Sequence, residues 1–234
     1  VAKAFQQGGG VAFEHYHDEL VDAIDLINRG NYEGRFVDYW LKSIPGAIAK
    51  LEAGINVLDV GCGVGRVSVK LAKAFANSNF IGIDCHKESI VKATDYAEEE
   101  GVASRVKFTQ QEIQFLETPQ TFELVTLCDC LHDLTKPTEI LQEIRKRLAP
   151  NGQLFIIEPK VADDLQDNCN DIATMLYGFS IFHCMTQSLA AGGPGLGTCM
   201  GPKNTEALVR DAGFNHFEVL NIKSQVNLFY LASV

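Results

Sequence analysis

The sequence lacks a long hydrophobic run, an excess of basic residues and a cysteine pattern typical of secreted proteins. No apolar stretch approaches the length of a membrane span, so we predict no membrane association. Lys and Arg number 20 against 30 Asp and Glu, and the resulting net charge of −10 argues against a nucleic-acid partner. The seven cysteines are scattered and no signal peptide is visible, which together predict a reducing, cytoplasmic location.

Metal-ligand spacing is also missing. Cys128 and Cys130 flank a single residue, and no second Cys or His pair with zinc-ligand spacing lies nearby in the sequence, so we predict no metal site. The remaining composition, 46% apolar and 21% charged, is that of an ordinary globular protein, and 234 residues suffice for one large domain. The chain starts at Val1 and not at Met, so we expect a fragment of a longer protein.

Short apolar strands alternate with helices over residues 55–158. Strands are predicted at 55–60, 80–84, 105–109, 124–128 and 153–158, with helices at 65–75, 87–100 and 137–148 and a turn at 150–152. This alternation predicts an α/β fold with a parallel, doubly wound sheet. Further strands at 216–222 and 226–232 are separated by a short turn, which predicts an antiparallel pair.

Two regions flank this pattern. Residues 1–50 are predicted to form an N-terminal helical segment ahead of a domain over 51–234, with helices at 14–28 and 32–43. Its aromatic residues either staple the helices onto the domain or form a lid over a ligand: Phe13, Tyr16, Phe36, Tyr39 and Trp40. Residues 160–202, with an apolar helix over 171–189 and a glycine-rich loop over 190–201, are predicted to be an insertion at the carboxyl edge of the sheet, where ligands bind. A last helix is expected over 204–212.

A glycine turn follows the first predicted strand and precedes a helix, which is the arrangement of a nucleotide-cofactor site. The turn contains Gly61, Gly63 and Gly65, whereas a dinucleotide fingerprint requires glycine at the position of Arg66. Asp59, two residues before the turn, would repel a pyrophosphate and accept hydrogen bonds from an ammonium group. The turn therefore favours S-adenosylmethionine over NAD, and the alternative for Asp59 is a carboxylate that caps the next helix.

Other candidate cofactor-binding residues follow later strands. Asp84 ends the second strand, where a carboxylate accepts both ribose hydroxyls, or else it caps the following helix. Cys85 would lie beside the adenine edge. Glu112 is expected to hold the adenine amino group and Ile113 to pack on the ring, although a solvated surface Glu is the alternative. The predicted site is completed by Cys62 in the glycine turn and Asp129 after the fourth strand.

The segments Val57–Gly65, Asp84, Leu124–Asp129 and Leu148-Ala149-Pro150-Asn151-Gly152 resemble class I S-adenosylmethionine-dependent methyltransferases. The resemblance covers about residues 56–158 and the terminal strand pair. It implies a Rossmann-like sheet of seven strands with the last strand antiparallel. The family usually has Gly in place of Asn151 and Asp in place of Glu112, and the second departure weakens the adenine assignment.

The C-terminal third has a narrower resemblance. Leu176-Tyr177-Gly178-Phe179-Ser180, His183-Cys184-Met185 and Gly195-Leu196-Gly197-Thr198 are similar to a methyltransferase subgroup whose members carry an N-terminal winged-helix domain and act on largely unassigned substrates. That domain is absent from this chain, as expected of a fragment. It serves dimerisation and substrate enclosure in related enzymes, so the resemblance implies a homodimer.

Histidines are the candidate general bases. His132-Asp133 resembles the pair found after the fourth strand of small-molecule O-methyltransferases, where the histidine is the base, although a structural histidine is the alternative. His183 either lines the substrate pocket or is a core histidine, and His17 is a weaker candidate. Glu158 either contacts substrate or makes a structural hydrogen bond.

We therefore predict methyl transfer from S-adenosylmethionine to a small molecule, preferably to oxygen. The alternatives are an NAD-dependent oxidoreductase and a cofactor-binding regulator without turnover.

Overall fold

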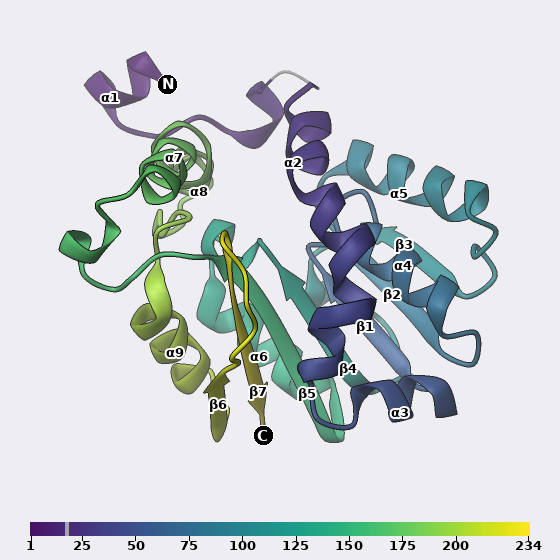
Figure 1. Cartoon of the computed structure of the whole chain (residues 1–234). Helices are drawn as coiled ribbons and strands as arrows, with labels where there is room; N and C mark the ends of the chain where they lie inside the picture. The colour runs from purple at the N-terminus through teal and green to yellow at the C-terminus, as the bar shows by residue number, and fades with distance from the viewer. Residues whose placement is uncertain (17–18) are drawn as a thin grey trace.

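The computed structural model describes residues 1–16 and 19–234, so His17 lies outside the described residues. Helices and strands alternate through most of the chain (Figure 1). The helices are α1 Ala2–Gln7, α2 Glu19–Arg35, α3 Ala47–Ala53, α4 Arg66–Ala74, α5 Lys87–Glu99, α6 Pro137–Arg147, α7 Asp171–Phe179, α8 Met185–Ala190 and α9 Gly201–Asp211. The strands are β1 Asn56–Val60, β2 Asn79–Asp84, β3 Val106–Gln110, β4 Phe122–Cys128, β5 Leu148–Pro159, β6 His216–Val219 and β7 Asn227–Ser233.

These strands form one seven-stranded sheet in the order β3-β2-β1-β4-β5-β7-β6. Strands β1 to β5 pair in parallel, while β7 runs antiparallel to both β5 and β6. The predicted doubly wound sheet with an antiparallel last strand is therefore confirmed. The chain winds outward in opposite directions from β1 and β4, and ligands bind at such a reversal of strand order.

Successive residues of the central strands point to opposite faces of the sheet, so each face acquires its own core. Val57 and Phe155 pack into a core with α4 and the N-terminal segment. Leu58 and Ile156 pack into the other core with α6 and α9. Because both faces are covered, the central strands are mostly apolar, as is typical of buried parallel strands.

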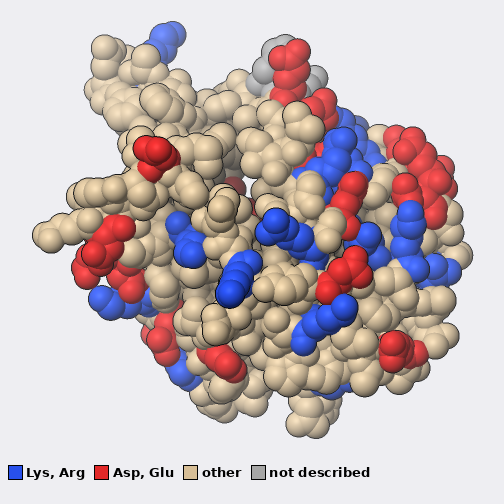
Figure 2. Space-filling model, viewed as in Figure 1, with Lys and Arg blue, Asp and Glu red and all other residues tan. Residues whose placement is uncertain are grey.

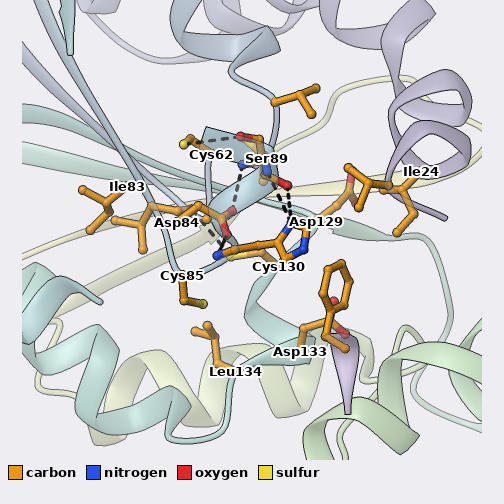
Figure 3. Close-up of a pocket in the computed structure, with 18 of the residues that line it drawn as sticks. Ile24, Cys62, Ile83, Asp84, Cys85, Ser89, Asp129, Cys130, Asp133 and Leu134 are labelled. Atoms are coloured by element: carbon orange, nitrogen blue, oxygen red, sulfur yellow. Dashed lines mark hydrogen bonds between the residues drawn. The ribbon is translucent and has the colours of Figure 1, made fainter. Parts of the chain in front are cut away.

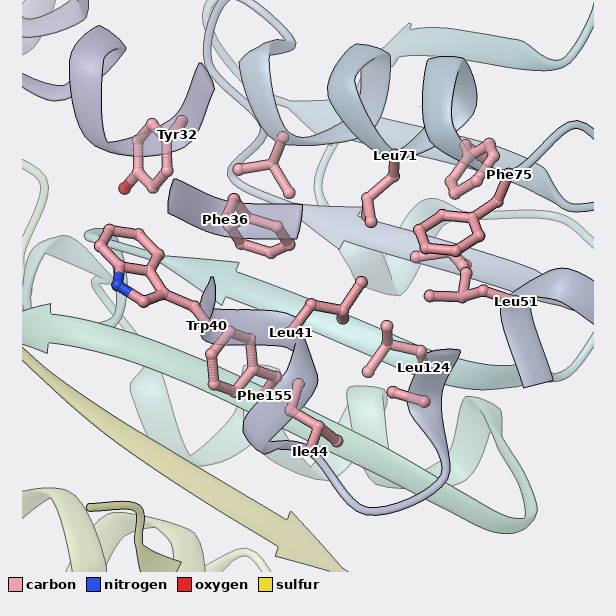
Figure 4. Packing of buried hydrophobic residues seen from close by; sticks show 14 of the residues in the cluster. Tyr32, Phe36, Trp40, Leu41, Ile44, Leu51, Leu71, Phe75, Leu124 and Phe155 are labelled. Carbon is pink, nitrogen blue, oxygen red and sulfur yellow. The ribbon is translucent and has the colours of Figure 1, made fainter. Parts of the chain in front are cut away.

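The N-terminal segment differs from the two separate helices that were predicted. Helix α2 continues to Arg35, past the expected end at residue 28, and a π-helical turn over Phe36–Trp40 follows it directly. Phe36 and Trp40 are fully buried, and the ring of Phe36 packs against that of Phe155 in the sheet (Figure 4). The ring of Trp40 packs against that of Phe229. Phe36 and Trp40 therefore anchor the segment on the domain, whereas Tyr39 of the same turn is exposed.

Strand β5 also differs from its prediction. It begins at Leu148, and the expected turn at 150–152 is an irregularity within the strand: Leu148 pairs with Phe122 and Gln153 with Leu124. Asn151 takes the left-handed conformation there, with φ of 63°. Asparagine tolerates that conformation, so the chain can bulge without leaving the sheet.

The predicted insertion is a helical layer above the carboxyl edge of the sheet. Helix α7, a π-helical turn over Ser180–Cys184 and helix α8 follow one another without a break, and a loop then leads to α9. In Figure 1 this layer lies beside α1 at the top of the molecule. Within residues 1–16 and 19–234, no helix has both the length and the apolar character needed to cross a membrane.

Candidate active site

A cavity of about 710 Å³ opens at the carboxyl ends of β1, β2 and β4. It is lined by all the predicted cofactor-binding residues except Gly65: Asp59, Gly61, Cys62, Gly63, Asp84, Cys85, Glu112, Ile113 and Asp129. Of the two predicted bases in the described part of the chain, His183 lines it and His132 does not. The fold thus gathers residues from four loops into one site.

The glycine turn is held by backbone hydrogen bonds. The amides of Gly61 and Cys62 donate to the carbonyl of Ile83, at 2.9 and 3.1 Å. Gly61 has a φ of 67°, and a Cβ there would lie 2.5 Å from Sγ of Cys130, so a side chain cannot be accommodated. At Gly63 a Cβ would meet nothing within 4 Å, which means that this position faces open space.

Gly65 has a different role from the other two. A Cβ at Gly65 would lie 2.6 Å from the ring of Phe108, and the residue caps α4 with a φ of 80°. It lies outside the cavity lining because it serves the packing of α4 on β3. Gly65 therefore matches the spacing of the other two glycines in the turn, but it is required for helix packing.

Asp84 joins β2 to the glycine turn. Its Oδ2 accepts a hydrogen bond from the amide of Gly63 at 2.9 Å, and its Oδ1 accepts one from the amide of His86 at 2.8 Å (Figure 3). Burial raises the pKa of this carboxyl, and the two backbone donors oppose that rise. The N-cap of α5 is His86, whose ring accepts from the amide of Ser89, so Asp84 does not cap that helix.

Asp59 lies deeper, beneath the turn. It is 2% exposed, and its oxygens accept hydrogen bonds from the hydroxyls of Ser68 at 2.8 Å and Thr126 at 2.7 Å. Burial raises the pKa of Asp59 to about 6 despite these two donors. The backbone amide of Ser68, in the first turn of α4, also lowers the pKa of Asp59, so the role of this carboxylate as a cap of that helix stays a prediction beside its role in cofactor binding.

Asp129, Glu112 and Cys85 occupy the rim and wall of the cavity. Asp129 accepts hydrogen bonds from the hydroxyl of Tyr32 and from Nδ2 of Asn227, and burial raises its pKa to about 6. Glu112 and Cys85 are exposed, and Glu112 accepts a hydrogen bond from Gln114. Ile113 is buried against the second core, with only part of it available to a ligand.

Helix α2 crosses the cavity and is anchored by Arg66. The guanidinium donates to both oxygens of Asp25, from Nε at 2.7 Å and from Nη2 at 2.8 Å, and to Glu33 at 3.0 Å. It also lies over the ring of Tyr96. Sequence reasoning missed this contact, because Arg66 was considered only as the residue in place of a third glycine. The spacing of acidic residues along α2 did not indicate that Asp25 and Glu33 would contact α4.

Aromatic rings surround His183 at the other end of the cavity. The ring of Phe13 lies 5.6 Å from that of His183, and the ring of Tyr16 lies 5.2 Å away. Phe13 also lines the cavity, so this part of the N-terminal segment covers the site as a lid would. Burial lowers the pKa of His183, and its Nε2 has no hydrogen-bond partner among the described residues.

His132 lies beneath this end and is 3% exposed. Its Nδ1 lies 2.6 Å from Oε2 of Glu158, and its Nε2 lies 3.4 Å from Oδ1 of Asp133. Burial alone would lower the pKa of His132, but the carboxylates of Glu158 and Asp133 outweigh it and hold the pKa well above its usual value. Glu158 also accepts from the amide of Leu131, so it makes the structural hydrogen bonds that were one of its two expected roles.

The charges of the cavity fit S-adenosylmethionine. Five buried or partly buried aspartates line it, and among the described residues Arg66, already paired with Asp25, is its only Lys or Arg. Such a lining attracts a sulfonium and an ammonium group and repels a pyrophosphate. The open position at Gly63 leaves room for a ligand to approach the backbone.

Comparison with known proteins agrees with this arrangement. Residues 51–213 match the family described as Methyltransferase domain. The chain is 35% identical to the ubiquinone biosynthesis O-methyltransferase of Colwellia psychrerythraea, over 43% of this chain and 40% of that protein. It is 29% identical to a sterol 24-C-methyltransferase of Gibberella zeae, over 50% of this chain and 31% of that protein. The chain thus spans less than half the length of these relatives.

A solved structure shares the fold. The O-methyltransferase family 2 protein of Planctomyces limnophilus, in complex with apigenin, superposes with a TM-score of 0.66 at 19% identity, covering 93% of this chain and 62% of that one. At this identity the likeness concerns the fold alone.

Proposed function

The chain belongs to the methyltransferase domain family, and on that premise we propose that it transfers a methyl group from S-adenosylmethionine to a hydroxyl oxygen of a small molecule. One observation carries this proposal. The predicted cofactor-binding residues other than Gly65 line the same cavity as His183.

Asp59, the glycine turn and Asp84 would hold the cofactor, with Glu112 and Ile113 at its adenine. When bound, S-adenosylmethionine supplies an electrophilic methyl group. The chain's own contribution is to align the acceptor, to exclude water beneath α2 and the N-terminal segment, and to hold the acceptor's proton. The charge distribution supports this division, since carboxylates gather at the glycine turn and aromatic rings gather at His183.

A phenolic acceptor is the substrate class that we propose. Apolar side chains line the cavity together with His183: Phe13, Val21, Ile24, Leu134 and Ile140. They suit a flat, partly apolar ring. The similarity to a ubiquinone biosynthesis O-methyltransferase, and the apigenin bound to a protein of the same fold, support a phenol. The similarity to a sterol 24-C-methyltransferase makes carbon the competing acceptor atom.

His183 is the better placed of the two predicted bases. It lines the cavity, its Nε2 is unpaired among the described residues, and its lowered pKa keeps the ring neutral near pH 7. A neutral imidazole can accept a proton from a hydroxyl. The role of His132 as a base stays a prediction, because its ring lies beneath the cavity, between Glu158 and Asp133.

The experiment is a methyl-transfer assay with labelled S-adenosylmethionine and a panel of catechols and flavonoids. Label should appear on a phenolic oxygen, and His183→Gln should lower turnover by about 10²–10⁴. Isothermal titration calorimetry with S-adenosylhomocysteine and with NAD serves as the binding control. Binding of NAD alone would contradict the proposal, whereas cofactor binding without product from any acceptor would favour a regulator.

The surface supports proposals about partners. Figure 2 shows acidic and basic side chains interspersed over one face, with few charges over α1 and the α7 region. Large apolar side chains are exposed there, including Phe5, Phe179, Ile181 and Phe182. We propose that a second copy covers this surface, that the protein is cytoplasmic and that it binds no nucleic acid. Light scattering of the purified chain should give the mass of a dimer, and Phe182→Ser should shift it toward the monomer.

A further inference from the structure

Three side chains with metal-binding groups meet beneath the acceptor end of the cavity. His132 and Asp133 lie in the 3-10 turn after β4, and Cys184 ends the π-helical turn between α7 and α8. A ring nitrogen of His132, a carboxylate oxygen of Asp133 and Sγ of Cys184 all lie within 4.8 Å of one another. Cys184 lies about fifty positions after the adjacent His132 and Asp133, which is why the spacing of cysteine and histidine in the sequence did not indicate a metal site.

The separation of these atoms suits a tetrahedral ion. Zinc binds nitrogen, oxygen and sulfur at about 2.0–2.3 Å, so neighbouring ligands of a tetrahedron lie about 3.3–3.8 Å apart. Nε2 of His132 lies 3.4 Å from Oδ1 of Asp133. A small closure of Cys184 toward the other two would complete three corners of such a site.

The imidazole of His132 is already oriented as a metal ligand. Its Nδ1 lies 2.6 Å from Oε2 of Glu158, which leaves Nε2 to face Asp133. Glu158 is fixed in turn, because its Oε1 accepts a hydrogen bond from the amide of Leu131 at 3.0 Å. Metal-binding histidines usually donate their second N–H to a carboxylate in this way, which sets both the tautomer and the ring orientation.

Two buried polar atoms beside the cluster have no hydrogen-bond partner among the described residues. They are Oδ1 of Asp133 and Nε2 of His183. His183 is 8% exposed, and its Nδ1 lies 3.5 Å from Sγ of Cys184. Both Asp133 and His183 line the cavity, so the cluster adjoins the cavity on the side of these two residues. Unsatisfied buried groups are rare in folded proteins and call for a partner.

We propose that His132, Asp133 and Cys184 bind a zinc ion and leave its fourth coordination position open toward the cavity. Thiolate and imidazole ligands favour zinc over magnesium or calcium, which prefer oxygen alone. Three protein ligands with an open position are typical of catalytic rather than structural zinc. The ion would polarise an acceptor hydroxyl that binds there, and this second step rests on the proposed function.

Cobalt titration of the metal-stripped 234-residue chain tests the site directly. Cobalt(II) should bind with one equivalent per chain and produce the thiolate-to-cobalt charge-transfer band of a four-coordinate site, which zinc then removes by displacement. Cys184→Ser should lose that band, whereas Cys199→Ser, a nearby partly exposed cysteine, should keep it. Absence of the band in the unaltered chain, or its survival in Cys184→Ser, would overturn the proposal.

Two further variants keep the test independent of the folding of Cys184→Ser. Asp133→Asn, whose side chain is 23% exposed, should weaken zinc binding, and Glu158→Gln should weaken it by about 10–100-fold through loss of the partner of His132. His216→Gln, which removes a surface histidine, is the matched control. Unchanged zinc affinity in both cluster variants would contradict the site.

The titration uses neither cofactor nor acceptor, so it separates this proposal from the proposed function. S-adenosylhomocysteine binding, measured on the same stripped chain, should be unaffected by zinc, and its absence would count against the proposed function alone. Methyl transfer at an equal rate with and without zinc would overturn the acceptor-activating step.

Discussion

The two ends of the cavity bury carboxylates in different ways. At the glycine turn, both oxygens of Asp59 and of Asp84 accept hydrogen bonds from hydroxyls or backbone amides. At the other end, Glu158 and Asp133 both lie beside His132, while Nε2 of His183 is buried and has no hydrogen-bond partner in the described part of the chain. The hydrogen bonds of the first end are made within the chain, whereas the second end is where we propose that a metal ion binds.

The difference has a physical reason. Buried carboxylates that accept several hydrogen bonds need no counter-ion, so the cofactor end can be preorganised before its ligand arrives. The acceptor end concentrates acid, imidazole and thiol groups whose charges depend on one another. Four predictions separate these two kinds of burial, from the largest expected effect to the smallest.

Loss of the charge on Glu158 should have the largest effect on stability. Glu158→Gln leaves His132 in a buried site without its carboxylate, and breaking such a pair costs about 3–5 kcal/mol of unfolding free energy. Urea denaturation of the metal-stripped chain measures it. Glu218→Gln, which alters an exposed pair with His216, should cost less than about 1 kcal/mol. Equal effects of the two changes would show that burial of the pair is irrelevant.

Asp84→Asn should weaken cofactor binding most strongly. The change removes a charged acceptor from the ribose and places an amide against the N–H of Gly63, so we expect a loss of about 2–3 kcal/mol in affinity for S-adenosylhomocysteine. Calorimetry gives the dissociation constant, and Asp95→Asn on the exposed face of α5 is the control. An unchanged dissociation constant would show that Asp84 stabilises the glycine turn and does not bind the cofactor.

Protonation of Asp59 at low pH should weaken cofactor binding and should also raise the free energy of unfolding. The pKa of this carboxyl is raised to about 6, so its contribution to stability is full below its unfolded value near 3.8 and is lost as the pH rises through 6. The ligand needs the ionised form, so affinity for S-adenosylhomocysteine should fall about tenfold between pH 7 and pH 5. Calorimetry at several pH values checks this, and Asp59→Asn should flatten the dependence. A flat profile in the unaltered chain would exclude Asp59 from cofactor binding.

Arg66→Ala should have the smallest effect, because it acts through helix α2. The change removes a two-bond contact with Asp25 and one bond with Glu33, and we expect a cost of about 1 kcal/mol in unfolding free energy, together with a few-fold weaker cofactor binding. Thermal unfolding and calorimetry measure the two quantities. Arg29→Ala, which removes a more exposed partner of Asp25, should change binding less. If both variants bind the cofactor as the unaltered chain does, α2 does not close the site.

Most of the fold could be read from local patterns. The positions of β1, β2 and α4 follow from apolar runs and glycine, since a buried parallel strand and the turn after it are dictated by neighbouring residues. The extent of α2 could not be read, because Phe36 and Trp40 continue the helix as a π-helical turn only when they pack on Phe155 and Phe229. Tertiary packing there outweighs local propensity.

The sequence by itself determined which residues meet at the proposed cofactor end: Gly61, Gly63, Asp59 and Asp84 lie within one strand–turn–helix–strand unit, so their proximity follows from chain connectivity. Only the tertiary structure decided the acceptor end. His132 and His183 come from segments that meet because the insertion folds over the sheet, and that packing turns one ring toward the cavity and holds the other beneath it, against Glu158. Periodicity records which face of an element is buried, but it does not record which distant element will cover that face.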